Sequence, residues 1–265
     1  MCYSTQQGKP ISELEKAMNA IAKLPEYLDD DDLQKYHING FGKQLLKGGK
    51  WQSIHPLMLV QPQENPKYLT PLMWGLIPHW ESGENANDYY KNSLKWGSGL
   101  NAQSEKLFSS NMYMKSAMTK RCVIPVTGFF EPHTTDVKAK GRPFKVPFFF
   151  HAKDTDFTLL AGIYAFASNG TATFSILTKS ATPLFEKIHN TKKRRPVILH
   201  KEDVDGWLNS SSTREDIEAI IANDLPDESI KAYPVSKDVY SPKAESNRPD
   251  ISDRVEYDEI SIKWE

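Results

Sequence analysis

The cysteine at position 2 carries the most distinctive chemistry in this chain, because removal of Met1 would leave an amine and a thiol on adjacent carbons. Removal is expected because the Cys2 side chain is small. An α-amine titrates at about 7.7–8.0 and a thiol at about 8.5, so both nucleophiles are accessible near neutral pH. Such a residue can transfer acyl groups or close a thiazolidine ring on an aldehyde. Cys2 can also be a small apolar residue that opens a strand, and its position alone slightly favours that role.

Three further polar side chains are candidates for chemistry, although none is decisive alone. Asn101 follows a glycine-bearing loop, where it or Ser104 can simply cap a helix. Glu131 is expected at a strand end, where a carboxylate is usually solvated. His189 is expected at the end of a short helix, where a lone histidine is more often structural than catalytic.

Basic and aromatic residues provide candidate contacts for nucleic acid. The strongest basic cluster consists of Lys192, Lys193, Arg194 and Arg195. A run of charge usually marks a solvated turn, but arginine side chains also suit phosphate groups. Trp74 and Trp80 enclose the segment GLIPH; one is expected in the core, and the other offers a face for stacking on a base.

Composition restricts the class of protein. The chain has 265 residues, with 33 Lys and Arg against 34 Asp and Glu, so its formal net charge is −1. This length can bury a full core, and any basic surface must be local. Two cysteines exclude a disulfide framework and a cysteine-rich zinc module, and the seven histidines show no ligand spacing. We therefore expect no metal and no cofactor.

The N-terminal residues have neither the basic nor the apolar region of a secretory signal. Nowhere do about 18 apolar residues follow one another, as a membrane span would require. We expect a soluble cytoplasmic protein with reduced thiols and no membrane partner.

The elements that must position these residues form a mostly antiparallel β core with flanking helices in one α+β domain. This domain is expected over residues 1–237, followed by an irregular tail over 238–265. Strands are predicted at residues 54–60, 68–77, 121–124, 127–131, 144–151, 157–166, 171–178 and 196–199. Pro71 suggests an edge position or a break within its strand.

Helical spacing predicts a helix over residues 11–24, with Ser12 and Glu15 as a capping box. Further helices are expected within residues 105–120, 182–189 and 213–223. Residues 43–50 and 81–99 are expected to form loops.

Six segments, taken in order, resemble the SOS response-associated peptidase (SRAP) family. They are Met1-Cys2 and residues 74–80, 101–105, 121–131, 161–164, and 188–189 with 195–199. The resemblance extends from Cys2 to about Val235. It places the nucleophilic role of Cys2 well ahead of the structural one.

The resemblance implies a compact α+β fold on a barrel-like antiparallel sheet, with a groove for single-stranded DNA. Family members respond to DNA damage by crosslinking their N-terminal cysteine to abasic sites, which shields the lesion. The implied partner is single-stranded DNA containing abasic sites, and the bound protein would be associated with the nucleoid. The family name also records an autoproteolytic activity that exposes this cysteine.

Family roles transfer to four residues of this chain. The resemblance implies that Cys2 is the nucleophile, that Asn101 positions the ring-opened sugar and the cysteine, and that Glu131 and His189 are catalytic. The Cys2 amine would attack C1′ to give an imine, on which the thiolate closes a thiazolidine. His189 is the expected general acid near neutral pH, and Glu131 is expected to move protons at the amine and thiol. Asn101 can hold a substrate hydroxyl without titrating.

The chain departs from the family pattern where DNA would be bound. Gln103 stands where many members carry arginine, and Tyr3-Ser4 replaces a small residue followed by a basic one. The interval between His189 and Pro196 is longer than in many members. We expect the basic cluster 192–195 to replace the missing charge, with Trp74, Trp80 and Gln103 as further DNA contacts.

Two alternatives remain open. A cysteine peptidase or amidase would also use Cys2 and His189, but it would turn over repeatedly, whereas a crosslinking protein is consumed once. A noncatalytic module for single-stranded DNA would use Trp80 and the basic cluster. In that module, Cys2→Ala would leave the function intact.

Overall fold

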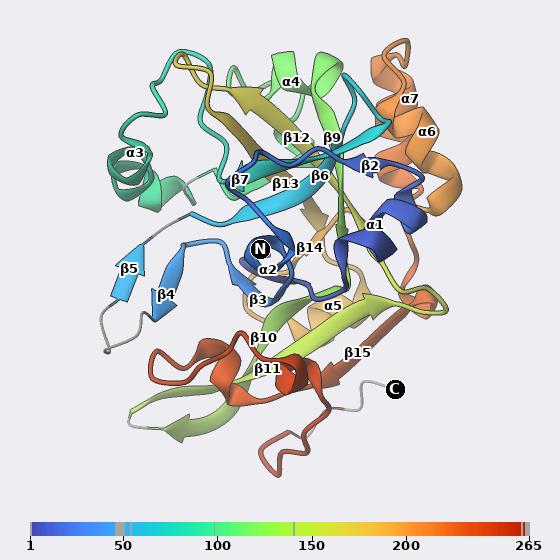
Figure 1. The fold of residues 1–265 in the computed structure, drawn as a ribbon. Coiled ribbons are helices and arrows are strands. Elements are labelled where there is room, and N and C mark those ends of the chain that lie inside the picture. Colours follow the sequence, from blue (N-terminus) through green and yellow to red (C-terminus); the bar gives the residue numbers. More distant parts are fainter. Residues whose placement is uncertain are drawn as a thin grey trace.

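Five strands close into a barrel at the centre of the structure (Figure 1). The computed structural model describes residues 2–45, 51–53, 55–97, 99–139, 141–260 and 262. The barrel runs β13–β12–β9–β6–β7, and parallel pairing of β7 with β13 closes it. Its strands are β6 (Leu57–Pro62), β7 (Tyr68–Trp74), β9 (Arg121–Val126), β12 (Thr158–Phe166) and β13 (Ala172–Ser180). Three short strands pair with β7 or β13: β2 (Ile21–Ala22), β8 (Asn101–Gln103) and β14 (Arg194–Pro196).

A second, antiparallel sheet lies below the barrel in Figure 1, in the order β15–β11–β10–β1–β3. Its strands are β1 (Ser4–Gln7), β3 (Lys35–Asn39), β10 (Gly128–Ala139), β11 (Arg142–Ala152) and β15 (Ile230–Pro234). Because side chains alternate along a strand, Phe129 joins the core cluster that contains Cys2, whereas Phe130 joins another cluster with Val239 and Ile251. The strand that carries Glu131 is therefore packed on both faces. A separate hairpin pairs β4 (Lys43–Leu45) with β5 (Trp51–Ser53).

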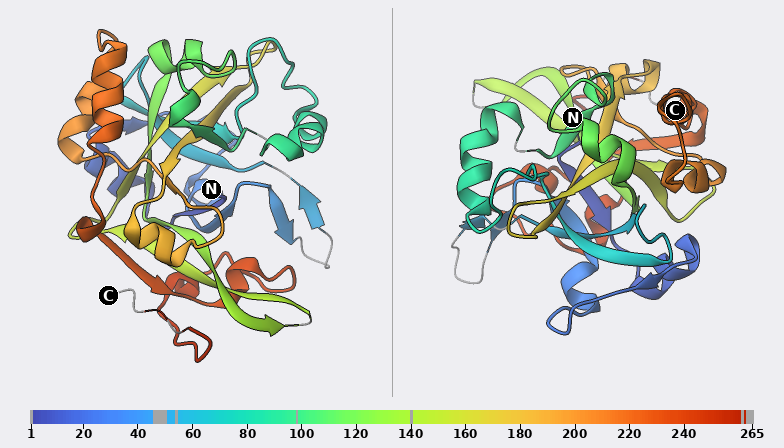
Figure 2. Two further views of the ribbon diagram at one scale, coloured as in Figure 1. Left: turned by 180° about the vertical axis from the view of Figure 1, so that it is seen from behind. Right: turned by 90° about the horizontal axis from the view of Figure 1, so that it is seen from above.

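Helices cover the barrel from several sides, and Figure 2 shows the same arrangement from behind and from above. A second apolar core lies between the barrel and these helices, with Leu14 of α1 and Trp207 of α6 completely or almost completely buried. The helices are α1 (Ile11–Met18), α2 (Asp30–Leu33), α3 (Ala86–Ser93), α4 (Met114–Thr119), α5 (Pro183–Ile188), α6 (Val204–Leu208) and α7 (Arg214–Ala222). Short 3-10 turns span Leu94–Trp96, Ser104–Lys106, Lys201–Asp203, Asp227–Ser229, Lys237–Tyr240 and Pro249–Ser252.

The expected α+β class with a mostly antiparallel, barrel-like core is confirmed. Pro71 lies in β7 between the residues that pair with β2 and those that pair with β13, as its missing N–H requires. The helix expected at residues 213–223 is also confirmed, and Thr213 and Asp216 form a capping box at its start.

The helix expected over residues 11–24 is wrong in its second half. It ends at Met18, because Asn19 adopts a left-handed conformation with φ of 47° and residues 21–22 pair with β7 instead. The capping box predicted from Ser12 and Glu15 does not form. Glu15 instead accepts a hydrogen bond from the Ala22 N–H at 2.8 Å, which ties the helix to the strand after it.

Other boundaries also shift. The loop expected over residues 81–99 contains α3, and the region 105–120 forms a helix only at α4. The strand expected at 196–199 lies at Arg194–Pro196, and the strand expected at 54–60 begins at Leu57. Of the loop expected at 43–50, residues 43–45 form β4, and residues 46–50 lie outside the described residues.

The polar segment after residue 238 packs on the outer face of the five-stranded sheet. Ile251 is completely buried there, and the Ser252 hydroxyl lies 3.2 Å from the Gln6 amide that donates to it. Tyr257 donates its hydroxyl to the carbonyl of Val235 at 2.8 Å. Among the residues that the structure describes, no helix is long and apolar enough to cross a membrane.

A buried arginine joins the barrel to two helices. Arg121, at the start of β9, is completely buried and donates hydrogen bonds to backbone carbonyls of α4, α6 and the residue after α6. The acceptors lie at 2.6–2.9 Å and belong to Ala117, Met118, Trp207 and Asn209. Burial lowers the pKa of Arg121 to about 10, which leaves the side chain charged at neutral pH.

We predict that Arg121→Met lowers the free energy of unfolding by at least about 3 kcal/mol, because it leaves several buried carbonyls unsatisfied. Urea unfolding followed by circular dichroism measures the loss. Arg214→Met, at an exposed arginine paired with Glu218, is the matched control and should change stability by about 0.5 kcal/mol or less. Equal effects of the two substitutions would contradict this assignment.

Candidate active site around Cys2

Antiparallel pairing of β1 with β10 brings Cys2 beside Glu131. Ser4 pairs with Phe130, so the chain preceding Ser4 runs toward the residues that follow Phe130. Cys2 is completely buried, and its thiol faces the carbonyl of Ser4 at 3.8 Å. In Figure 1 the N-terminal end lies between the barrel and the lower sheet. The candidate nucleophile is therefore part of the core.

Asn101 holds the backbone of Cys2. It begins β8, which is fixed by parallel pairing with β13 opposite Ile176. Its side-chain Nδ2 donates a hydrogen bond to the carbonyl of Cys2 at 2.8 Å. Its buried Oδ1 has no hydrogen-bond partner among the described residues, so this oxygen can accept a hydrogen bond from a ligand.

Glu131 and His189 form a buried pair. His189 follows α5, and its Nδ1 lies 3.4 Å from Oε2 of Glu131. Two contacts fix the end of α5 on β10: His133 Nδ1 lies 2.9 Å from the carbonyl of Ile188, and Asn190 donates to the carbonyl of Thr134 at 2.9 Å. Cys2, Asn101, Glu131 and His189 thus converge from four separate segments.

Burial determines the protonation of these groups. It raises the pKa of Glu131 to about 7 and lowers that of His189 to about 4. Burial, followed by the charge of Glu131, raises the pKa of the Cys2 thiol. At neutral pH His189 is therefore neutral, and Glu131 is substantially protonated. These directions favour Glu131 over His189 as the proton donor, contrary to the expectation from the sequence.

Two phenols also lie within electrostatic range of the site. Burial, then Glu131 and Cys2, raise the pKa values of both Tyr3 and Tyr240, although 39% of Tyr240 remains exposed. Tyr3 packs on Phe41 with ring centroids 4.8 Å apart. The sequence marks Tyr3 only as a departure from the family pattern. Tyr240 comes from the segment expected to be irregular, so no local pattern relates it to Cys2.

Two of the predicted DNA contacts are buried and have structural roles. Trp74 is completely buried and donates its indole N–H to the carbonyl of Leu100 at 2.9 Å, so it supports the strand that carries Asn101. Arg195 is completely buried and pairs with Asp224 at 3.0 Å. These positions do not fit direct contact with DNA. Trp80, in contrast, is 52% exposed and fits a stacking surface.

The basic cluster offers less free charge than its sequence suggests. Arg194 makes two hydrogen bonds to Glu105, at 2.7 and 2.9 Å, so a carboxylate already neutralises it. Lys192 and Lys193 are exposed. Gln103 is partly buried at the end of β8 and pairs with Thr178.

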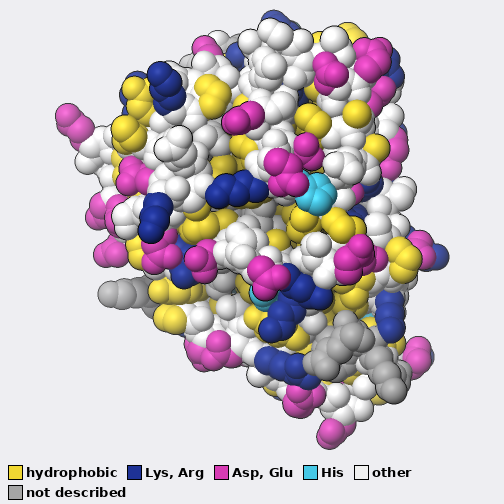
Figure 3. All heavy atoms as spheres, turned by 90° about the vertical axis from the view of Figure 1, so that its right-hand side faces the viewer, with side chains coloured by type: hydrophobic (Ala, Val, Ile, Leu, Met, Phe, Trp, Pro, Cys, Tyr) yellow, Lys and Arg dark blue, Asp and Glu magenta, His cyan; other side chains and the backbone are white. Residues whose placement is uncertain are grey.

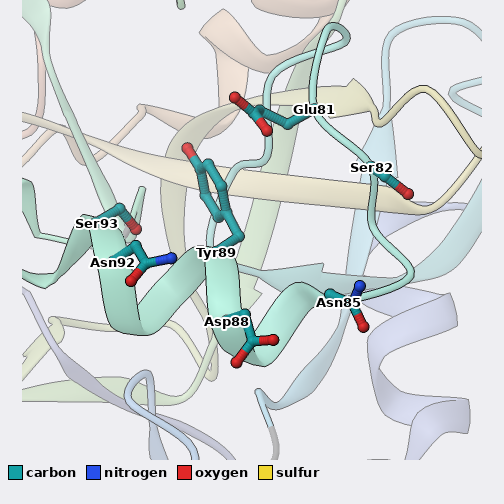
Figure 4. A pocket seen from close by; sticks show the side chains of 7 residues that line it. All are labelled: Glu81, Ser82, Asn85, Asp88, Tyr89, Asn92 and Ser93. Atoms are coloured by element: carbon teal, nitrogen blue, oxygen red, sulfur yellow. The ribbon is translucent and has the colours of Figure 1, made fainter.

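The surface carries charges of both signs. On the face seen in Figure 3, lysine and arginine side chains are interspersed with acidic ones. A hollow of about 410 Å³ beside α3 is lined by Glu81, Asp88 and neutral polar side chains (Figure 4). Cys2 does not line it. The described residues contain no cluster of three or more His, Cys, Asp or Glu side chains that could hold a metal ion.

The raised pKa of Glu131 makes the stability of the fold depend on pH. A carboxyl group with a pKa of about 7 in the fold and an ordinary value of 4.5 binds more protons when folded. Stability is therefore lost as the pH rises from about 4.5 to about 7. We predict that Glu131→Gln, which cannot ionise, gains up to about 3 kcal/mol relative to the wild type over this interval.

Urea unfolding of both proteins at about pH 4.5 and pH 8 measures this gain. The opposite pH dependence of His189, whose stabilising neutral form is lost as the pH falls, is common to both proteins. Glu218→Gln, at an exposed helical position, should show no comparable change. A difference between wild type and Glu131→Gln that is the same at both pH values would refute the raised pKa.

Comparison with known proteins agrees with the family resemblance. The family described as SOS response associated peptidase (SRAP) matches residues 1–242. The abasic site processing protein YoqW of Bacillus subtilis is 30% identical over 235 residues, which cover 84% of this chain and 93% of that protein. The abasic site processing protein YMR114C of Saccharomyces cerevisiae is 27% identical over 174 residues, or 63% of this chain and 43% of that protein. A crystal structure of a protein from Bacteroides thetaiotaomicron superposes with a TM-score of 0.78 and 26% identity, covering 96% of this chain and 100% of the other. The chain therefore belongs to the SRAP family.

Proposed function

We propose that this protein recognises abasic sites in single-stranded DNA and captures them through a covalent thiazolidine at Cys2. The names of the relatives, abasic site processing proteins, support the class of lesion. The observation that carries the chemistry is the position of Cys2, whose backbone is held by Asn101 beside a carboxyl group with a pKa of about 7.

The proposed reaction needs only groups of this chain and the ring-opened sugar. Once Met1 is removed, the Cys2 amine adds to the C1′ aldehyde to form a carbinolamine. Protonated Glu131 donates its proton to the hydroxyl group, which leaves as water, and a protonated imine remains. The Glu131 carboxylate then takes the thiol proton, and the sulfur bonds to C1′. The products are a thiazolidine and one water, and Glu131 regains its proton.

Asn101 and His189 position the reacting groups. The Asn101 Nδ2 donates a hydrogen bond that fixes the Cys2 carbonyl. Its Oδ1 can accept a hydrogen bond from the hydroxyl group that ring opening leaves on the sugar. Neutral His189, whose Nδ1 lies 3.4 Å from Oε2 of Glu131, limits the rotation of the carboxyl group. Holding amine, thiol and aldehyde together turns the reaction into an intramolecular one, which is the main source of rate.

The alternatives are less well supported. A cysteine peptidase needs a thiolate near neutral pH, whereas burial and Glu131 raise the pKa of the Cys2 thiol. A noncatalytic DNA-binding module would not require a buried Cys2 held by Asn101 next to a Glu131–His189 pair.

We predict that the purified protein, with Met1 removal verified by mass spectrometry, forms a heat-stable adduct with a single-stranded oligonucleotide containing one abasic site. Cys2→Ala should abolish the adduct, because both the amine and the thiol are needed for the ring. Cys122→Ala, at the other buried cysteine, is the matched control and should retain the adduct. Absence of an adduct from processed wild-type protein would refute the proposal, and repeated product release from a peptide or amide substrate would favour a peptidase.

The single-turnover rate of crosslinking should follow Glu131. Because the protonated form donates to the leaving hydroxyl, we expect the rate to decline above about pH 7, while amine protonation limits it at lower pH. Glu131→Gln should lower the rate by about 10²–10⁴-fold and remove the alkaline limb. Quenched gel assays between about pH 5 and pH 9 test this. An unchanged alkaline limb in Glu131→Gln would assign the proton donor to another group.

A further inference from the structure

A second hollow lies beside α4, and its charge is opposite to that of the acidic hollow beside α3. It measures about 180 Å³, and the charged or polar side chains that line it are His79, Asn111, Lys115, Ser116 and Lys120. No aspartate or glutamate is among its lining residues. We call it the basic hollow.

We propose that the basic hollow binds the phosphate backbone of the single strand that flanks the abasic site, while Trp80 and Phe166 stack on its bases. This inference rests on the proposed function and adds the path of the DNA. It assigns a role to two lysines outside the basic cluster 192–195.

Exposed aromatic side chains accompany the lysines. Trp80 is 52% and Phe166 40% exposed, which is unusual for such large apolar side chains. The Lys120 ammonium lies 4.9 Å from the centre of the Phe166 ring, and the His79 ring lies 5.0 Å from that of Trp80. Alternation of aromatic faces with cations is how proteins bind single strands without reading their sequence.

Backbone hydrogen bonds fix Lys120 between α4 and β12. The N–H of Lys120 donates to the carbonyl of Ser116 at 2.8 Å, at the end of α4. The carbonyl of Lys120 in turn accepts from the N–H of Tyr164 at 2.8 Å. The hollow is thus attached to β12 of the barrel.

The opposite charges of the two hollows set the direction in which the single-stranded DNA would run. Glu81, directly after Trp80, and Asp88 line the acidic hollow, where Figure 4 shows both carboxylates. Single-stranded DNA carries one negative charge per nucleotide and is repelled from that side. The lysines of the basic hollow attract it, so the strand should pass from Trp80 toward α4.

Hydrogen bonds join the segment that leads into the basic hollow to the segment that leads to Asn101. The N–H of Leu76 donates to the carbonyl of Gly99 at 3.0 Å, and the N–H of Ile77 donates to the Thr173 hydroxyl at 2.9 Å. Gly99 has φ of 66°, and a Cβ atom there would clash with the Leu76 carbonyl. Figure 1 shows α4 above the barrel, whereas the N-terminal end lies below it. The hollow should therefore contact the flank of the strand and not the lesion.

The test compares Lys115→Glu/Lys120→Glu with a control double variant, Lys201→Glu/Lys231→Glu, that changes the net charge equally at exposed lysines elsewhere. Fluorescence anisotropy measures binding to an undamaged single strand of about 20 nucleotides over a range of salt concentrations. We expect the hollow variant to bind at least about 10-fold more weakly at low salt. The negative slope of log affinity against log salt concentration should become shallower by about 1.4, as expected for two lost phosphate contacts.

Crosslinking adds a second readout. The hollow variant should react more slowly than wild type with a long abasic strand at subsaturating concentration, but at the wild-type rate with an abasic site flanked by one nucleotide on each side. Phe166→Ala should weaken binding without changing the salt slope, because stacking neutralises no phosphate.

Each outcome decides a separate point. Wild-type affinity and salt slope in the hollow variant would overturn the inference and leave the hollow to a protein partner. An equal loss in the control variant would overturn it in favour of general electrostatics. If wild-type protein forms no crosslink but the hollow variant still binds the undamaged strand more weakly, the proposed function fails and the basic hollow stands.

Discussion

Desolvation of three ionisable side chains is the constraint on which the site depends. Cys2, Glu131 and His189 lie almost without solvent contact between the barrel and the five-stranded sheet. A buried group avoids charge, so the carboxyl group keeps its proton, the imidazole stays neutral and the thiol stays a thiol. The same burial makes ionisation of Glu131 costly for the fold, and the surrounding apolar core offsets that cost.

Strand pairing sets the geometry of these groups. The four residues lie far apart in the chain, yet each belongs to an element whose register is fixed: Cys2 precedes β1, Asn101 begins β8, Glu131 lies in β10 and His189 follows α5. Stacked rings support this arrangement: the ring centroids of Phe150 and of Phe185 in α5 lie 4.7 Å apart. The site thus shares its packing with the core.

Local patterns in the sequence were sufficient for the β core and for α7, because alternation and capping depend on neighbouring residues. They were insufficient where a distant partner decides the outcome. The helix ends at Met18 because the next residues pair with β7, and Arg195 lies inside because Asp224 and Phe185 receive it. The family resemblance indicated all four central residues, but the protonation of Glu131 and His189 follows from burial, which single residues in a sequence do not reveal.

The burial of Cys2 bears on the stage at which Met1 would be removed. Cys2 is the first of the four central residues to leave the ribosome, whereas Glu131 and His189 are synthesised much later. After folding, the peptide bond that precedes Cys2 joins a residue with no exposed surface. A separate aminopeptidase is therefore expected to act more readily on the nascent chain, before β10 exists to pair with β1. Self-cleavage, by contrast, would have to await the assembled fold, so the timing of processing relative to translation distinguishes the two routes.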